Sequence, residues 1–123
     1  MTPGEAFKIV DAAEWARAEV LGAYEGSAVD LADGYIHLST AEQLAGTAAR
    51  HYVGRSSLLL LTVALSQVEA PVVWEPSRGG ALFPHIYGSL PVAAVTARRT
   101  MSVAQDGVMT LGPILAAGPE TFS

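Results

Sequence analysis

The sequence contains no cysteine among its 123 residues. This absence excludes disulfide bonds, thiolate nucleophiles and cysteine-based zinc sites together. A chain without cysteine suits a reducing compartment, so we expect a cytoplasmic protein. The longest apolar run, around residues 58–65, is too short to cross a bilayer, and we expect no membrane association.

Charged residues are also few, at 15% of the chain, and the basic ones are the scarcer. With 7 Lys and Arg against 12 Asp and Glu the formal net charge is −5, which argues against duplex nucleic acid as a partner. Hydrophobic residues, by contrast, make up 50% of the chain and indicate a compact globule. We expect a single domain over residues 1–123 with its core at about 6–100, and a tail from 107 to 123 that adds one β segment.

The first third of the chain alternates predicted strands, helices and turns. Residues 6–10 form an apolar strand, and Asp11 with Glu14 three residues later predicts the start of a helix that Gly22 ends. Residues 22–34 are rich in turn formers and predict a loop.

The stretch GYIHLST, residues 34–40, has the alternation of a short strand over residues 35–38. On such a strand Ile36 and Leu38 share one face, which we expect to be buried. The residues of the opposite face, which we expect to line a cleft or to meet solvent, are Tyr35, His37 and Ser39.

Two further elements follow this strand. Thr40 and Gln43 form a capping box, and apolar residues recur at helical spacing over 41–52, so a second helix is predicted there. The run Ser57–Ala64 is continuously apolar, as in a strand that is covered on both faces and lies centrally in a sheet.

The second half of the chain is rich in predicted strands. We expect strands at 72–74 and 92–98, with a loop over residues 75–81. Because helices come early and strands late, the order favours an α+β fold over a doubly wound parallel one. No glycine-rich phosphate motif follows a predicted strand, which argues against Rossmann and P-loop nucleotide sites.

The three histidines are the main candidates for chemistry. His85 follows a glycine-rich loop, where side chains are commonly presented to ligands, whereas His37 taken alone is as easily a hydrogen-bonded strand residue. His51 ends the second predicted helix, where an imidazole offsets the helix dipole, so we interpret it as structural. No H-x-x-H or H-x-x-x-H pair occurs, and we expect no metal. Glu75, at the end of a predicted strand, is a candidate acceptor or base.

Two longer motifs are DGYIHLST at residues 33–40 and FPHIYGSLP at residues 83–91. Shorter segments accompany them at residues 7–9, Trp15, 24–30 and 74–75. Together these residues resemble domain-of-unknown-function family 952, a family of small bacterial proteins, over about residues 6–100. The resemblance implies a family but no activity.

A second, more distant resemblance concerns shape. The strand IHLST followed by a helix, and the later segment LPVAAV, are similar to the closing half of RNA 2′-phosphotransferases of the ADP-ribosyltransferase superfamily. This resemblance implies an ADP-ribosyltransferase-like split mixed β-sheet with two main helices, a nicotinamide-sized cleft and NAD as cofactor. His37 stands where that superfamily carries a Tyr, and His85 stands near the place of a Glu. Since an imidazole cannot stabilise a developing cation as a carboxylate does, this departure argues against ordinary protein ADP-ribosylation.

Two hypotheses of function result. In the first, the cleft binds a nucleotide of the NAD or ADP-ribose type or another small phosphorylated ligand, which His37 orients while His85 acts as donor or general acid, as in an NAD-dependent transferase. The other residues expected at the ligand are Tyr35, Ser39, Thr40, Glu75 and Tyr87, the hydroxyls of Ser39 and Thr40 lying at a helix start. In the second hypothesis the cleft binds a ligand or a protein without turnover.

Overall fold

The strands of the protein form three antiparallel sheets in a computed structural model that describes residues 4–115, apart from the side chain of Arg78. The largest sheet has the order β1-β4-β8-β9, from β1 (Glu5–Asp11), β4 (Leu58–Ala64), β8 (Val95–Val103) and β9 (Met109–Ile114). The second has the order β3-β6-β5, from β3 (Ile36–His37), β6 (Leu82–Ile86) and β5 (Val72–Pro76). The third pairs β2 (Ala23–Tyr24) with β7 (Leu90–Pro91).

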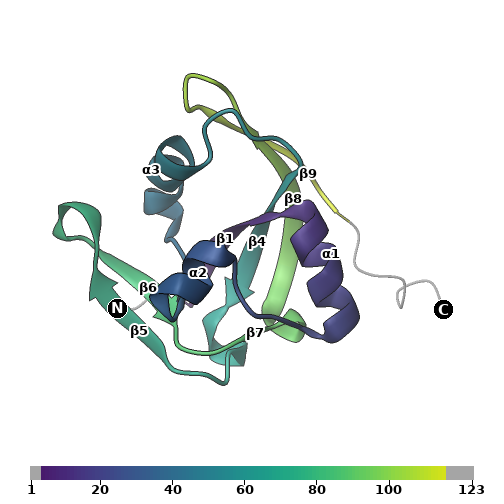
Figure 1. Cartoon of the computed structure of the whole chain (residues 1–123), viewed down its shortest axis with the longest axis vertical. Coiled ribbons are helices and arrows are strands. Elements are labelled where there is room, and N and C mark those ends of the chain that lie inside the picture. The colour runs from purple at the N-terminus through teal and green to yellow at the C-terminus, as the bar shows by residue number, and fades with distance from the viewer. Residues whose placement is uncertain (1–3, 116–123) are drawn as a thin grey trace.

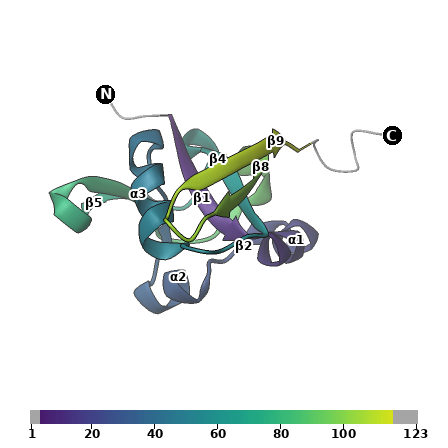
Figure 2. The same ribbon diagram turned by 90° about the horizontal axis from the view of Figure 1, so that it is seen from above.

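Two main helices, α1 (Ala12–Leu21) and α3 (Ala41–His51), lie to either side of the largest sheet (Figures 1 and 2). A short helix, α2 (Ala28–Asp33), and three single 3₁₀ turns complete the elements, the turns being η1 (Leu65–Gln67), η2 (Arg78–Gly80) and η3 (Val92–Ala94). The predicted α+β class is confirmed. Every strand pair within residues 4–115 is antiparallel, so the expectation of a mixed sheet is wrong.

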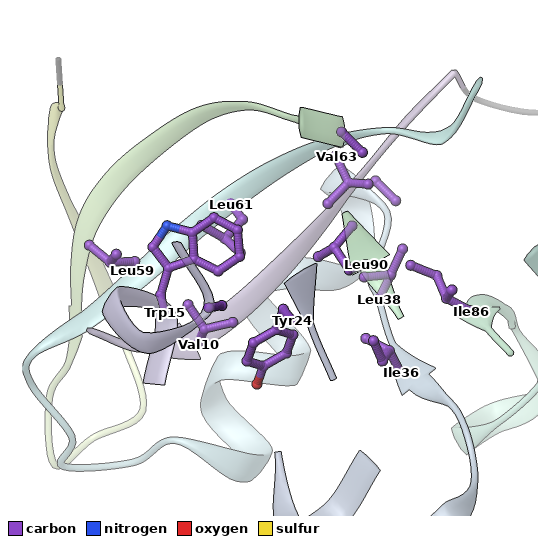
Figure 3. Packing of buried hydrophobic residues seen from close by; sticks show 13 residues of the cluster. Val10, Trp15, Tyr24, Ile36, Leu38, Leu59, Leu61, Val63, Ile86 and Leu90 are labelled. Carbon is purple, nitrogen blue, oxygen red and sulfur yellow. The ribbon is translucent and has the colours of Figure 1, made fainter. Parts of the chain in front are cut away.

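Strand β4 divides the core into two apolar clusters. Its Leu58 and Leu60 face α3, together with Ile9, Leu44, Ala48, Met101 and Val103. Its Leu59, Leu61 and Val63 face the opposite way and pack with Trp15, Tyr24, Ile36 and Leu38 (Figure 3). The prediction of a strand covered on both faces and central in its sheet is therefore confirmed.

Capping residues set the ends of the two main helices as the sequence predicts. The Asp11 carboxylate accepts the amides of Ala13 and Glu14, and Gly22 ends α1 in the left-handed conformation. At α3 the Thr40 hydroxyl accepts the Gln43 amide, and the Gln43 side chain accepts the Thr40 amide.

Three boundaries differ from the predictions. The region 22–34, expected to be a loop, contains α2, because Ser27 and Asp30 form a capping box of their own. The loop expected over 75–81 is shorter, since β5 continues to Pro76 and β6 begins at Leu82. The strand expected at 92–98 begins only at Val95, because a 3₁₀ turn precedes it.

The two larger sheets meet at the end of β3. Phe7 of β1 and Ser39 exchange two backbone hydrogen bonds, each of 2.8 Å. The β5–β6 hairpin projects from the body of the molecule in both overall views (Figures 1 and 2). Strand β9 lies in the tail expected to add a β segment, and the rest of that tail, 116–123, is outside the described residues. No helix of the described part of the chain is long and apolar enough to cross a membrane.

Candidate functional site

Four aromatic rings gather on one face of the β3–β6 pair. His37 and His85 are direct cross-strand partners, so their side chains project from the same face. Their ring centroids lie 5.4 Å apart in an edge-on arrangement. Tyr35 stacks on His85 with centroids 4.1 Å apart and also contacts His37 at 4.7 Å and Tyr87 at 5.2 Å. The pairing of β3 with β6 thus brings the two histidines together beside Tyr35. Ile36 and Leu38 are buried on the other side, as expected from the alternation in the sequence.

A carboxylate orients the ring of His85. Val73 of β5 lies opposite His85, which makes Glu75 a diagonal neighbour on the same face. The Nδ1 of His85 lies 2.7 Å from a Glu75 oxygen, and the Tyr87 hydroxyl donates to the same carboxylate at 2.8 Å. These hydrogen bonds from His85 and Tyr87 lower the pKa of Glu75 below its ordinary value. An ionised carboxylate only accepts, so Nδ1 carries the proton and Nε2 of the neutral ring has a lone pair.

Two carboxylates hold the ring of His37. Its Nδ1 lies 2.6 Å from Asp30 Oδ1, and its Nε2 lies 2.9 Å from Asp33 Oδ2. The first of these contacts is a hydrogen bond, and the second is a contact at ion-pair distance. His37 is about one third exposed, whereas His85 is 4% exposed. The two imidazoles therefore differ: His37 has both ring nitrogens beside carboxylates at the surface, whereas His85 is buried with one nitrogen held.

Asp30 joins three segments of the chain at this point. Its carboxylate, 2% exposed, forms an ion pair with Lys8 Nζ at 3.0 Å and accepts from the Ser27 amide at 2.9 Å and from the His37 amide at 3.1 Å. Burial by itself disfavours the charged carboxylate, but the hydrogen bond from His37 and the charge of Lys8 outweigh it. The pKa of Asp30 is therefore held well below its ordinary value.

Lys8, the only lysine of the chain, was not predicted to belong to the site, and neither were Asp30 and Asp33. It lies on β1 on the same side as Ala6 and Val10, and it is 5% exposed. Burial lowers its pKa, while the carboxylate of Asp30 acts in the opposite direction. One signal was present in the sequence, because a single cation in the middle of an apolar strand needs a buried counter-charge.

These groups line a cleft of about 570 Å³, a size suited to a small-molecule ligand. Of the residues predicted to meet the ligand, the ones that line it are Tyr35, His37, Ser39 and His85. His51, interpreted as structural, also lines it from the end of α3. The other ionisable groups that line the cleft include two cations, Lys8 and Arg55, and four carboxylates, Asp11, Glu14, Asp30 and Asp33.

Three predicted ligand residues lie outside the cleft lining. Glu75 hydrogen-bonds His85 and accepts from Tyr87, and neither Glu75 nor Tyr87 lines the cleft. The Thr40 hydroxyl caps α3, while the Ser39 hydroxyl bonds that of Thr47 at 2.9 Å. The amino end of α3 thus has a side-chain cap, and its hydroxyls are already engaged. Within residues 4–115 no group of three or more His, Asp or Glu side chains is arranged to hold a metal ion.

The fold and the site define a small α+β domain with a histidine-lined cleft between its two larger sheets. The family described as "Protein of unknown function (DUF952)" matches residues 9–98. The chain belongs to this family, as its two motifs predict.

The solved structures of one bacterial protein are similar to this chain. The crystal structure of protein CC0527 from Caulobacter crescentus is 46% identical, with a TM-score of 0.81, over 86% of this chain and 93% of that one. The solution NMR structure of CC0527 is 46% identical as well, with a TM-score of 0.74, over 86% of this chain and 91% of that one. The search of curated proteins finds no match.

Proposed function

We propose that the cleft binds a small ligand and that His85 exchanges a proton with it while His37 orients it. The observation that carries this proposal is the pair of imidazoles, 5.4 Å apart, each with Nδ1 held by a carboxylate. At His85 the Glu75 carboxylate on Nδ1 fixes the tautomer and the direction of the ring, which prepares Nε2 for general acid–base work. No hydrogen bond from His85 Nε2 to another described residue competes with a ligand for that nitrogen.

Nucleotides of the NAD and ADP-ribose type are the first ligands to test. We choose these ligands because the segments IHLST and LPVAAV are similar to segments of RNA 2′-phosphotransferases. The charges of the cleft restrict where a phosphate group could bind, because carboxylates outnumber the fixed cations along the walls of the cleft. A phosphate would have to lie near Arg55 and His85 rather than beside Asp30, which adjoins His37.

A second candidate function is binding without turnover. Both ring nitrogens of His37 lie within 2.9 Å of a carboxylate oxygen, so neither nitrogen is open to a ligand. A site in which only His85 is available for proton transfer also serves as a recognition site. Turnover of the bound ligand separates the two functions.

The test is a thermal-shift and NMR screen with NAD, ADP-ribose and mononucleotides, followed by an assay for nicotinamide release from NAD. We expect a ligand-dependent rise in Tm that His85→Gln and His37→Gln abolish. Arg50→Gln, on the exposed side of α3, is the control that keeps it. Nicotinamide release that His85→Gln removes selects the transferase, and binding without release selects the recognition site. Unchanged binding in both folded histidine variants overturns the proposal.

A further inference from the structure

We infer that Tyr87 is a positioning residue for the cleft. Through Glu75 it holds His85 as a proton acceptor, so that the ligand group that meets Nε2 of His85 is an O–H or N–H donor. This inference rests on the proposed function of the cleft as a ligand site. It adds the direction of the proton transfer and a residue that controls it from outside the cleft lining.

The hydroxyl of Tyr87 holds the carboxylate of Glu75. It lies 2.8 Å from one oxygen of that carboxylate and 3.0 Å from the other. Tyr87 comes two residues after His85, so the alternation of β6 places both side chains on one face, and the Tyr87 amide donates to the Pro71 carbonyl at 2.9 Å. The hydrogen bond to Glu75 raises the pKa of Tyr87, so the phenol keeps its proton and remains a donor. The orientation of the carboxylate is therefore set by Tyr87.

Glu75 needs this second contact because it lies near the surface. It belongs to β5, the edge strand of its sheet, and its side chain is one third exposed. A glutamate in such a place has several rotamers available, and water competes for its oxygens. His85 is buried and has no such freedom, so its Nδ1 proton depends on Glu75 Oε1, at 2.7 Å, for an acceptor.

The other groups that face His85 do not replace Glu75. The ring of His37 lies edge-on at 5.4 Å, and its nitrogens lie beside two other carboxylates. Tyr35 contacts His85 through its ring face, and its hydroxyl makes no hydrogen bond to another described residue. The carboxylate of Glu75 is therefore the group that determines which nitrogen of His85 carries the proton.

The position of that proton selects the partner of His85 in the cleft. With the proton on Nδ1, Nε2 carries a lone pair and can only accept. A ligand O–H or N–H donates to Nε2, and in a proton transfer its proton moves to Nε2 while Nδ1 keeps its own. The imidazolium that forms is stabilised by the ionised carboxylate of Glu75.

The test measures the tautomer of His85 by ¹⁵N NMR at neutral pH, in the protein without ligand. We expect a protonated Nδ1 and an unprotonated Nε2 in the wild type. In Tyr87→Phe both nitrogen shifts should move toward the values of mixed tautomers, and in Glu75→Gln they should move further. The pKa of Glu75, followed by ¹³C NMR, should rise in Tyr87→Phe toward its ordinary value, because the hydrogen bond from Tyr87 helps to lower it.

Tyr35→Phe is the matched control, since it removes a hydroxyl from the ring that stacks on His85 but leaves Glu75 and Tyr87 in place. We expect it to keep the nitrogen shifts of the wild type. Tyr87 is 40% exposed, so Tyr87→Phe should remain folded with little change in Tm. Equal nitrogen shifts in Tyr87→Phe and the wild type overturn the inference even if the pKa of Glu75 rises. A proton on Nε2 in the wild type, or an equal change in Tyr35→Phe, also overturns it.

These measurements need no ligand, so their failure is distinct from a failure of the proposed function, which His85→Gln tests in the ligand screen. An unchanged tautomer in Tyr87→Phe removes the positioning role of Tyr87 and leaves the ligand site standing.

Discussion

Asp30 is the residue on which the geometry of the cleft depends, because it holds Lys8, the start of α2 and His37 together. We expect Asp30→Asn to destabilise the protein by about 3–5 kcal/mol, since it leaves the buried Lys8 ammonium without its counter-charge. Urea unfolding measures the loss.

The matched double variant isolates the ion pair. Lys8→Met combined with Asp30→Asn removes both charges, and we expect it to recover part of the stability lost in Asp30→Asn. Additive effects of the two substitutions would show that Lys8 and Asp30 do not interact in the folded protein.

Gly26 allows Asp30 to take this position. Its φ of +117° favours glycine, and a Cβ there would lie 2.8 Å from the Cβ of Asp30. We expect Gly26→Ala to cost at least about 1–3 kcal/mol and to shift the ring signals of His37 in NMR spectra, because the Asp30 carboxylate must move. Gly46→Ala, in a helical position with open space around it, is the control and should leave those signals unchanged. Unmoved His37 signals in a destabilised Gly26→Ala would contradict the link.

Individual residues of the site were predictable to different degrees. Strand alternation placed Tyr35 and His37 on one face, and the structure pairs that face with His85. The lone lysine of an apolar strand indicated a buried counter-charge, but Asp30 as its partner was not predictable. The two residues meet through tertiary contacts between β1 and α2 that no local pattern encodes.

Helix α3 depends on its capping box. We expect Thr40→Ala to destabilise the protein by about 1 kcal/mol, because the Gln43 amide loses its acceptor, while Thr40→Ser retains most of the stability. Chemical denaturation of the three proteins gives the comparison. Equal stability of Thr40→Ala and the wild type would show that water replaces the cap at no cost.

Helix α1 was predictable from its two ends, Asp11 and Gly22, and α3 from a capping box followed by an apolar stripe. Helix α2 was not predicted, because six residues are too few to show helical periodicity and the tertiary contacts of Asp30 add to the capping box. Its local signals were the spacing of Ser27 and Asp30 and the glycine at position 34.

The stability of the complete protein should fall in acid. The folded-state pKa values of Asp30 and Glu75 lie below their ordinary values of 3.8 and 4.5. The unfolded chain therefore binds more protons at low pH, so this stabilisation is present above about pH 5 and is lost as the pH falls toward the folded-state values. Urea midpoints at several pH values test it, and Asp30→Asn should show a shallower decline. An equally steep decline in that variant would assign the acid sensitivity to other carboxylates.

The arrangement of the sheets was only partly predictable from the chain. Continuous apolarity identified β4 as the central strand, since both of its faces are covered. Strand direction has no such signature, and each pair turned out antiparallel where a distant resemblance implied a mixed sheet. The cleft arises from the meeting of two sheets at Phe7 and Ser39, a long-range pairing beyond the reach of local patterns.

In the proposed function His85 and His37 belong to one ligand site, and an NMR titration of their ring signals with ADP-ribose is the most direct measurement. We expect both rings to shift with one saturable dependence on concentration, and His85→Gln to abolish the shift of His37. Saturable binding that leaves the signals of His37 and His85 fixed would rule out a shared site.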